Sequence, residues 1–225
     1  MKRNIFSVFI VLAVLFLPFF VSAHQPRIVE NELVKVQNPE VSQAFYGELK
    51  NHPQYFEIDS DKKFNLYVGV LMPDVSGIKT DISAEVIKVG ENNREVIGVL
   101  DGVKFSWKRF YEPFAGDHYF QGPEFFTPAE PGKYLVMVSS PDFLGKYTLV
   151  IGQQESFSFG ETWRTLQILP GLKKDFFGRS PLTMFFNYIG LGILVILIII
   201  AAAIFLTIKI IKNRNFRKKQ ELIQH

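Results

Sequence analysis

The sequence contains no cysteine, and this absence excludes several classes of protein. Without thiols the chain cannot hold a disulfide framework, a thiol nucleophile, a cysteine-ligated zinc site or an iron–sulfur cluster. The sequence also lacks the motifs G-x-S-x-G and H-E-x-x-H, and it has no P-loop. It has no N-x-[ST] sequon, which together with the missing cysteine favours a prokaryotic surface protein. We therefore expect a protein that is not an enzyme.

Charge is also absent over one long stretch, because residues 180–208 contain no charged side chain. A helix over the 24 residues from 185 to 208 would be about 36 Å long, enough to cross a hydrocarbon layer of about 30 Å. Phe185 and Tyr188 begin this stretch, and aromatic rings favour the membrane interface. A buried core helix is the alternative, but charge-free runs of this length are typical of membrane spans. We predict a transmembrane helix at residues 182–208.

The first 23 residues have a different pattern. They begin with Lys2 and Arg3, continue with a short apolar run and end with small side chains at Val21 and Ala23. This order is typical of a secretory signal peptide, which we expect to be cleaved after Ala23. An uncleaved N-terminal anchor is the alternative; Pro18 and the residues before the cleavage site favour cleavage.

The charges on either side of the predicted span predict its orientation. Residues 209–225 contain six basic residues and one acidic residue, whereas residues 24–181 contain 17 basic and 21 acidic residues. Basic residues next to a span remain in the cytoplasm, so Lys209 and Lys212 are expected to anchor the helix there. We predict a single-pass protein of the cell membrane with an extracytoplasmic N-terminal domain and a basic cytoplasmic tail that contacts lipid, not nucleic acid.

Residues 24–155 have the pattern of short β-strands. Phe64, Leu66 and Val68 alternate with polar or small residues, and residues 134–138 and 147–151 show the same period of two. About eight such strands, separated by turn sequences such as Asp101-Gly102, predict a mainly β protein. The expected fold of this region is an antiparallel, jelly-roll-like β-sandwich.

Two similar strands near the end of this region carry a family resemblance. The segments GKYLVMV at 132–138 and GKYTLVIG at 145–152 resemble the closing hairpin of the bacterial and archaeal pre-peptidase C-terminal domain. Residues 56–58 and 64–68 are similar to earlier strands of that domain, so the resemblance covers roughly residues 45–152. It implies a small β-sandwich of the kind attached to secreted peptidases and other surface proteins, where it is an accessory module and not the catalyst.

Residues 156–181 connect the predicted sandwich to the predicted span. A short helix is expected here, ended by Pro170. Leu172, Phe176 and Phe177 lie among lysines and arginine, a composition that favours a juxtamembrane segment with short interfacial helices. The alternative is an ordinary linker with aromatic anchors.

One aromatic-rich stretch is the candidate for ligand binding. Residues 111–124 combine aromatic rings with carboxylates, prolines and glycines, and such loops form binding surfaces for peptides or sugars. The alternative is a rigid connection whose rings cap the core. The candidate residues for binding a protein or glycan partner are Tyr111, Phe114, Asp117, Tyr119 and Glu124.

The histidines suggest an alternative function. Cleavage after Ala23 would make His24 the mature N-terminus, and its amine and imidazole together could chelate a metal. With a second imidazole, from His118 or His52, such nitrogen ligands suit Cu(II). No spacing ties these residues together, so an exposed terminal histidine without a cofactor is the other interpretation.

Overall fold

The computed structural model describes residues 24–156 and 158–221, with side chains as far as residue 215. The predicted signal peptide lies outside the described residues. The chain divides into two compact units: Val21–Met184 forms one of them, and the long helix α3 (Tyr188–Glu221) belongs to the other.

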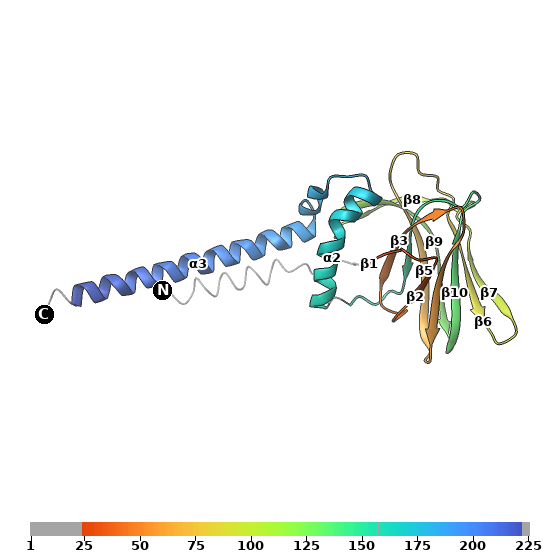
Figure 1. Cartoon of the computed structure of the whole chain (residues 1–225), viewed down its shortest axis with the longest axis horizontal. Helices are drawn as coiled ribbons and strands as arrows, with labels where there is room; N and C mark the ends of the chain where they lie inside the picture. Colours follow the sequence, from red (N-terminus) through yellow and green to blue (C-terminus); the bar gives the residue numbers. More distant parts are fainter. Residues whose placement is uncertain (1–23, 157, 222–225) are drawn as a thin grey trace. The chain divides into compact units, whose positions relative to one another are not determined.

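Two stacked sheets form the first unit (Figure 1). The strands are antiparallel except at one edge of each sheet, where β1 pairs with β3 and β2 pairs with β4 in parallel. This arrangement confirms the predicted β-sandwich. In spatial order the six-stranded sheet contains β1 (Gln25–Ile28), β3 (Gln43–Lys50), β11 (Leu144–Ile151), β5 (Phe64–Pro73), β9 (Asp117–Ala129) and β8 (Lys108–Glu112). The five-stranded sheet contains β2 (Leu33–Val36), β4 (Gln54–Ser60), β10 (Gly132–Ser139), β6 (Ser83–Val89) and β7 (Arg94–Leu100).

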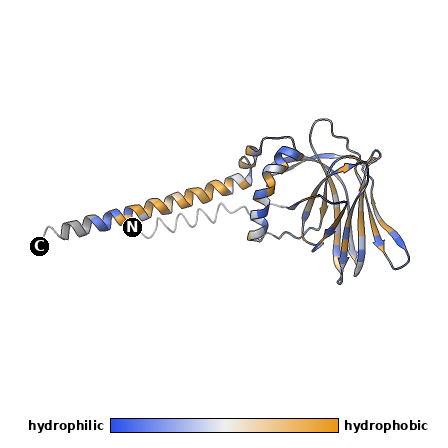
Figure 2. Ribbon diagram, in the orientation of Figure 1, coloured by the Kyte–Doolittle hydropathy of each residue, from blue (hydrophilic) through white to orange (hydrophobic). Residues whose placement is uncertain are grey.

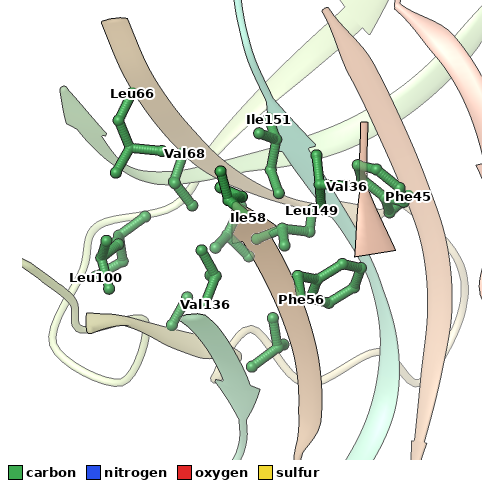
Figure 3. Packing of buried hydrophobic residues seen from close by; sticks show 14 of the residues in the cluster. Val36, Phe45, Phe56, Ile58, Leu66, Val68, Leu100, Val136, Leu149 and Ile151 are labelled. Atoms are coloured by element: carbon green, nitrogen blue, oxygen red, sulfur yellow. The ribbon is translucent and has the colours of Figure 1, made fainter. Parts of the chain in front are cut away.

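The main core lies between the inner faces of the two sheets (Figure 3). Alternate residues of each strand point into it, as the period of two predicts. Leu66 and Val68 of β5 and Leu149 of β11 are completely buried there, opposite Phe56 of β4 and Val136 of β10. The core contains aliphatic and aromatic side chains from both sheets, so burial of apolar surface is its main source of stability.

The two similar strands do not form the hairpin that their spacing predicted. β10 pairs with β4 and β6, whereas β11 pairs with β3 and β5 in the other sheet. The chain therefore crosses from one sheet to the other between them. Gly132 and Gly145, which begin the two segments, both have positive φ angles (144° and 124°), which favour glycine. Tyr134 and Tyr147 point into the common core from opposite sheets.

The turn expected at Asp101-Gly102 is present at residues 102–104, but it does not join two strands in a short hairpin. β7 ends at Leu100 and the next strand, β8, begins only at Lys108. A Cβ at Gly102 would lie 1.8 Å from the carbonyl oxygen of Ile82, and the Gly102 carbonyl accepts a hydrogen bond of 2.7 Å from Trp107 Nε1. This glycine allows a close backbone approach, so the Asp-Gly pair does not make a two-residue turn.

A helical segment follows the last strand. It consists of α2 (Phe159–Gly171) and the π-helical turn η1 (Leu172–Phe176), so Pro170 lies inside the last turn of α2 and does not end the helical segment. Leu172, Phe176 and Phe177 are buried in a second cluster with Tyr119 of β9. These side chains pack on the six-stranded sheet, so they do not form an exposed apolar face of this segment.

The second unit contains α3, which begins at Tyr188 after the 3-10 turn η2 (Pro181–Phe185). Its residues 188–215 form one helix that is long and apolar enough to span a membrane. Figure 2 shows the hydrophobic colouring along most of α3 and hydrophilic residues toward its C-terminal part. The four expected anchor residues are all exposed: Phe185, Tyr188, Lys209 and Lys212.

Candidate functional site

The aromatic-rich stretch forms a β-hairpin, not a loop. β8 and β9 pair directly, and only residues 113–116 form the turn between them. Tyr111 is 48% exposed and its ring lies 4.8 Å from that of His118, whereas Asp117 and Tyr119 are buried. Phe114 is half-buried in the turn, and Glu124 is exposed further along β9. The structure therefore does not gather the five candidate residues on one surface.

Asp117 belongs to a buried ion pair. Lys173 of η1 donates from Nζ to Asp117 Oδ1 at 2.6 Å and to the carbonyl oxygen of Ala115 at 2.6 Å. The side chains of Lys173 and Asp117 are 1% and 2% exposed. Burial raises the pKa of Asp117, although the Lys173 ammonium opposes this shift. The pair joins η1 to the β8–β9 turn, so its role is to fix the helical segment on the sheet.

Glu112 is the last residue of β8, directly before the same turn. Its carboxylate accepts hydrogen bonds from the backbone N–H groups of Phe114 (2.7 Å) and Ala115 (2.8 Å). Burial raises the pKa of Glu112, and the nearby Asp117 adds to the shift, while these two backbone hydrogen bonds oppose it. Glu112 thus caps the hairpin turn from the side that faces η1.

Aromatic contacts complete the packing of η1 on the sheet. The hydroxyls of Tyr46 and Tyr119 are 3.0 Å apart and share a hydrogen bond. The rings of Tyr46 and Phe176 meet edge to face at 5.1 Å, and Tyr119 and Phe177 do so at 5.4 Å. Lys146 of β11 donates to the carbonyl oxygen of Asp175 at 2.7 Å. The C-terminal part of this segment is therefore held by apolar, aromatic and polar contacts together.

A cleft of about 650 Å³ lies between the outer face of β3 and the α2–η1 segment. Its apolar lining consists mainly of Tyr46, Ile168, Leu172 and Phe176. Charged residues of both signs surround this lining. The acidic ones are Glu30, Glu32, Glu48 and Asp175, and the basic ones are Lys50 and Lys146. Its volume is within the range of ligand sites, about 300–1,000 Å³. We name it the β3–α2 cleft.

Sequence reasoning missed this cleft. Its walls come from segments more than 100 residues apart, since Tyr46 lies on β3 and Ile168 on α2. The single available signal was the mixture of apolar and charged residues in 159–177, which we assigned to a membrane surface.

The three candidate copper ligands lie far apart. β1, which follows His24 directly, is four strand spacings from β9, which carries His118, and this corresponds to about 19 Å. His52 lies beyond the far end of β3, roughly 30 Å along the strand direction from the level of His24. The structure therefore does not bring His24 together with either histidine. Within residues 24–156 and 158–215, no group of three or more His, Asp or Glu residues is placed to hold a metal ion.

His24 itself is half-buried. Its Nδ1 forms a hydrogen bond with the hydroxyl of Ser42. Burial lowers the pKa of His24, while the charge of Glu155 opposes the shift. The imidazole is therefore neutral at neutral pH, which is the form that binds metals.

No protein-family model matches the sequence, and no curated protein matches it either. Among solved structures, the chain is similar to the pre-peptidase C-terminal domain of collagenase from Bacillus anthracis, with 14% identity and a TM-score of 0.33 over 55% of this chain and 96% of that domain. It is also similar to the Yersinia pseudotuberculosis-derived mitogen, with 11% identity and a TM-score of 0.34 over 53% of this chain and 92% of the mitogen. A third similar structure is CorA, a surface-associated copper-binding protein important in copper acquisition in Methylomicrobium album BG8. That match has 13% identity and a TM-score of 0.20 over 60% of this chain and 87% of CorA.

The strand pairing shows the β-sandwich that we expected from the resemblance to the pre-peptidase C-terminal domain. That domain is among the solved structures similar to this chain. At these identities the similarity concerns the fold alone.

Proposed function

We propose that this protein is anchored in the cell membrane by α3 and presents its β-sandwich outside the cytoplasm as a non-catalytic binding module. In this proposal residues 1–23 direct export and are removed, and the basic residues in the C-terminal part of α3 keep the C-terminus in the cytoplasm. The β3–α2 cleft receives a segment of a partner protein. The cleft is the observation that carries the binding role.

The chemistry of the cleft favours a peptide segment. An apolar lining with Tyr46 and Phe176 offers anchor surface for a side chain, because aromatic residues at the centre of an interface contribute most binding energy. Acidic and basic groups around it provide partners for the charges that a polypeptide carries. A sugar would be expected to need more hydrogen-bonding groups at the centre of the site than these apolar side chains provide.

Membrane topology can be tested directly because the chain has no native cysteine. Lys62→Cys places a thiol on an exposed turn of the sandwich, and Asn213→Cys places one on the exposed C-terminal part of α3. A membrane-impermeant maleimide should label the first variant in intact cells and the second only after permeabilisation. Labelling in the reverse order would overturn the proposed orientation, and labelling of neither variant before permeabilisation would overturn export.

The binding role can be tested with a photo-crosslinking residue placed in the cleft. A crosslinker at Glu48 should give an adduct of defined mass in intact cells, and Lys50→Glu in the same protein should reduce its yield about tenfold, the effect of roughly 1.4 kcal/mol. The matched controls are a crosslinker at exposed Glu95 on β7 and the charge reversal Lys108→Glu on β8. Adducts that form equally at Glu95, or that do not respond to Lys50→Glu, would contradict binding in the cleft.

Copper binding through His24 is a second candidate function. The observation in its favour is the half-buried imidazole of His24, whose pKa is lowered by burial so that the ring is neutral at neutral pH. Copper would have to displace Ser42 from Nδ1, the ring nitrogen that can chelate together with the amine. After removal of residues 1–23, its free amine and imidazole would form a chelate for Cu(II). Mass spectrometry of the mature protein should then show one copper ion, lost in His24→Ala and retained in His118→Ala. A blocked or unprocessed N-terminus, or equal loss in both variants, would contradict this function.

A further inference from the structure

A second cavity, of about 460 Å³, lies on the other side of β1 from the β3–α2 cleft. It opens where β1 and β2, the edge strands of the two sheets, separate, and the first turns of α2 line its remaining side. Arg27 of β1 is paired in register with Phe45, an inner-face residue of β3, so its side chain points between the sheets. We name this space the β1–β2 cavity.

The charged lining of the β1–β2 cavity is mainly basic. It consists of Arg27, Lys35, Arg164 and a single acid, Glu161. Glu161 is already paired with Arg27, at 2.8 Å between Oε2 and Nη1. Among the described residues, neither Lys35 nor Arg164 forms an ion pair, so two positive charges at the cavity are uncompensated.

Arg27 is held in a fixed position. Besides Glu161, its guanidinium donates to Gln25 Oε1 at 2.6 Å and to the carbonyl oxygen of Pro26 at 3.1 Å. Its side chain is 18% exposed, and these contacts still leave N–H groups of the planar guanidinium for a ligand. A guanidinium that is already ordered loses little further conformational freedom when an anion binds.

Polar neutral groups complete the lining. Gln25, Gln37, Asn38 and Gln43 supply amide groups, and Ser156 and Ser158 supply hydroxyls. Gln43 Nε2 donates to the carbonyl oxygen of Gln37 at 2.8 Å, so the loop after β2 is also ordered at the cavity. The first turn of α2, capped by Ser158, adds its positive potential to that of the three basic side chains.

We propose that the β1–β2 cavity binds a phosphate-class oxyanion between Arg27 and Arg164. Lys35 lies at the rim of the cavity, because Val34 and Val36 on either side of it face the core. Arginine side chains bind the oxygens of phosphate in pairs, and the ammonium of Lys35 adds charge attraction. The cavity is larger than a single phosphate ion, so the anion can be a phosphate group on a larger molecule. That molecule can be a phospholipid or a soluble phosphate ester, and both supply the same chemistry.

Titration of the full-length protein in dodecyl maltoside, a detergent without phosphate, tests the site with inorganic phosphate as the probe. We expect saturable binding in the wild type and an affinity about tenfold lower in Arg164→Ala, because a charge-assisted hydrogen bond is lost. Lys35→Ala should weaken binding less. Both side chains are exposed and form no described ion pair, so thermal unfolding should be unchanged. The matched control is Arg94→Ala on β7, an exposed arginine away from the cavity, which should bind as the wild type does.

Absence of saturable binding in the wild type, or equal weakening in Arg94→Ala, would overturn the proposal. A second arm distinguishes the two sources of the anion. Nanodiscs of phosphatidylcholine with added phosphatidic acid should compete with inorganic phosphate if the source is a lipid, and should not compete if it is soluble. This cavity is separate from the β3–α2 cleft. A negative result in the phosphate titration therefore does not contradict partner binding in the cleft, and a negative crosslinking result does not contradict anion binding here.

Discussion

The two faces of the six-stranded sheet are buried in different ways. The inner face is covered by the second sheet and contributes apolar side chains such as Leu66 and Leu149. The outer face is partly covered by α2 and η1, and buried polar groups lie among its aromatic rings, including the Lys173–Asp117 ion pair. Apolar burial needs only complementary shape, whereas a buried polar group also needs a specific partner. The outer face therefore depends on individual pairs and the inner face on total packing.

The largest effect should come from separating the buried ion pair. Lys173→Met leaves the Asp117 carboxylate buried without its cation, which should lower the free energy of unfolding by about 3–5 kcal/mol. The double variant Lys173→Met/Asp117→Leu should recover most of this loss, because no uncompensated charge remains. Denaturant unfolding of the full-length protein in detergent measures both. A single variant as stable as the double one would show that the pair does not behave as a unit.

Shortening a side chain in the inner core should lower the free energy of unfolding somewhat less than breaking the ion pair. Removing a partner side chain should not restore this loss. Leu149→Ala removes a completely buried side chain between the sheets and should cost about 2–5 kcal/mol through lost burial and an unfilled cavity. The matched control is Leu144→Ala on the same strand, where the leucine is 48% exposed. Equal losses at both positions in the same unfolding experiment would contradict the assignment of the core.

The hydrogen-bonded pair Tyr46–Tyr119 should behave as the ion pair does, with a smaller loss of stability in the single variant. Tyr46→Phe leaves the buried Tyr119 hydroxyl without its partner and should cost about 1–2 kcal/mol. Tyr46→Phe/Tyr119→Phe removes both hydroxyls and should be close to the wild type in stability. If the double variant loses the sum of two single losses, the hydroxyls make independent contributions.

The smallest effect should appear as a dependence on pH. Burial raises the pKa of Glu112 above its ordinary value of 4.5. The contribution of Glu112 to the free energy of unfolding is therefore fully present below the pKa of this group in the unfolded protein. It is lost as the pH rises through the higher pKa in the folded protein. Glu112→Gln does not titrate, so its stability relative to the wild type should increase from pH 4.5 toward neutrality. A Glu112→Gln curve parallel to that of the wild type would show that the pKa of the Glu112 carboxyl is not raised.

The inner face of the sheet could be predicted from the sequence, whereas the outer face could not. The period of two at residues 64–70 depends on local geometry alone, and the structure confirms it. Pairing between strands is not local: the 13-residue spacing of the two GKY segments fits a hairpin, yet β10 and β11 lie in different sheets. Each of these strands finds two better partners among strands formed earlier in the chain.

The contacts of Lys173 illustrate the limit for the candidate site. A lysine beside phenylalanines before an apolar helix is typical of a membrane interface, and this pattern gave no indication that residues 172–177 pack on the sheet. Its partner, Asp117, is 56 residues away, and nothing in the local sequence marks the two as a pair. The β3–α2 cleft and the β1–β2 cavity depend on the same long-range placement of α2, so neither was predicted.

The position of η1 in the chain has a mechanical consequence. η1 is the last segment that packs on the sandwich before the chain continues to η2 and α3. Tension applied to the chain from the C-terminal side therefore reaches the buried rings of Phe177 and Phe176, and then Lys173, before it reaches any strand. These ring contacts and the Lys173–Asp117 ion pair resist it first. If these contacts broke, η1 and α2 could unwind and lengthen the connection between the β-sandwich and α3. Every strand of both sheets would stay paired.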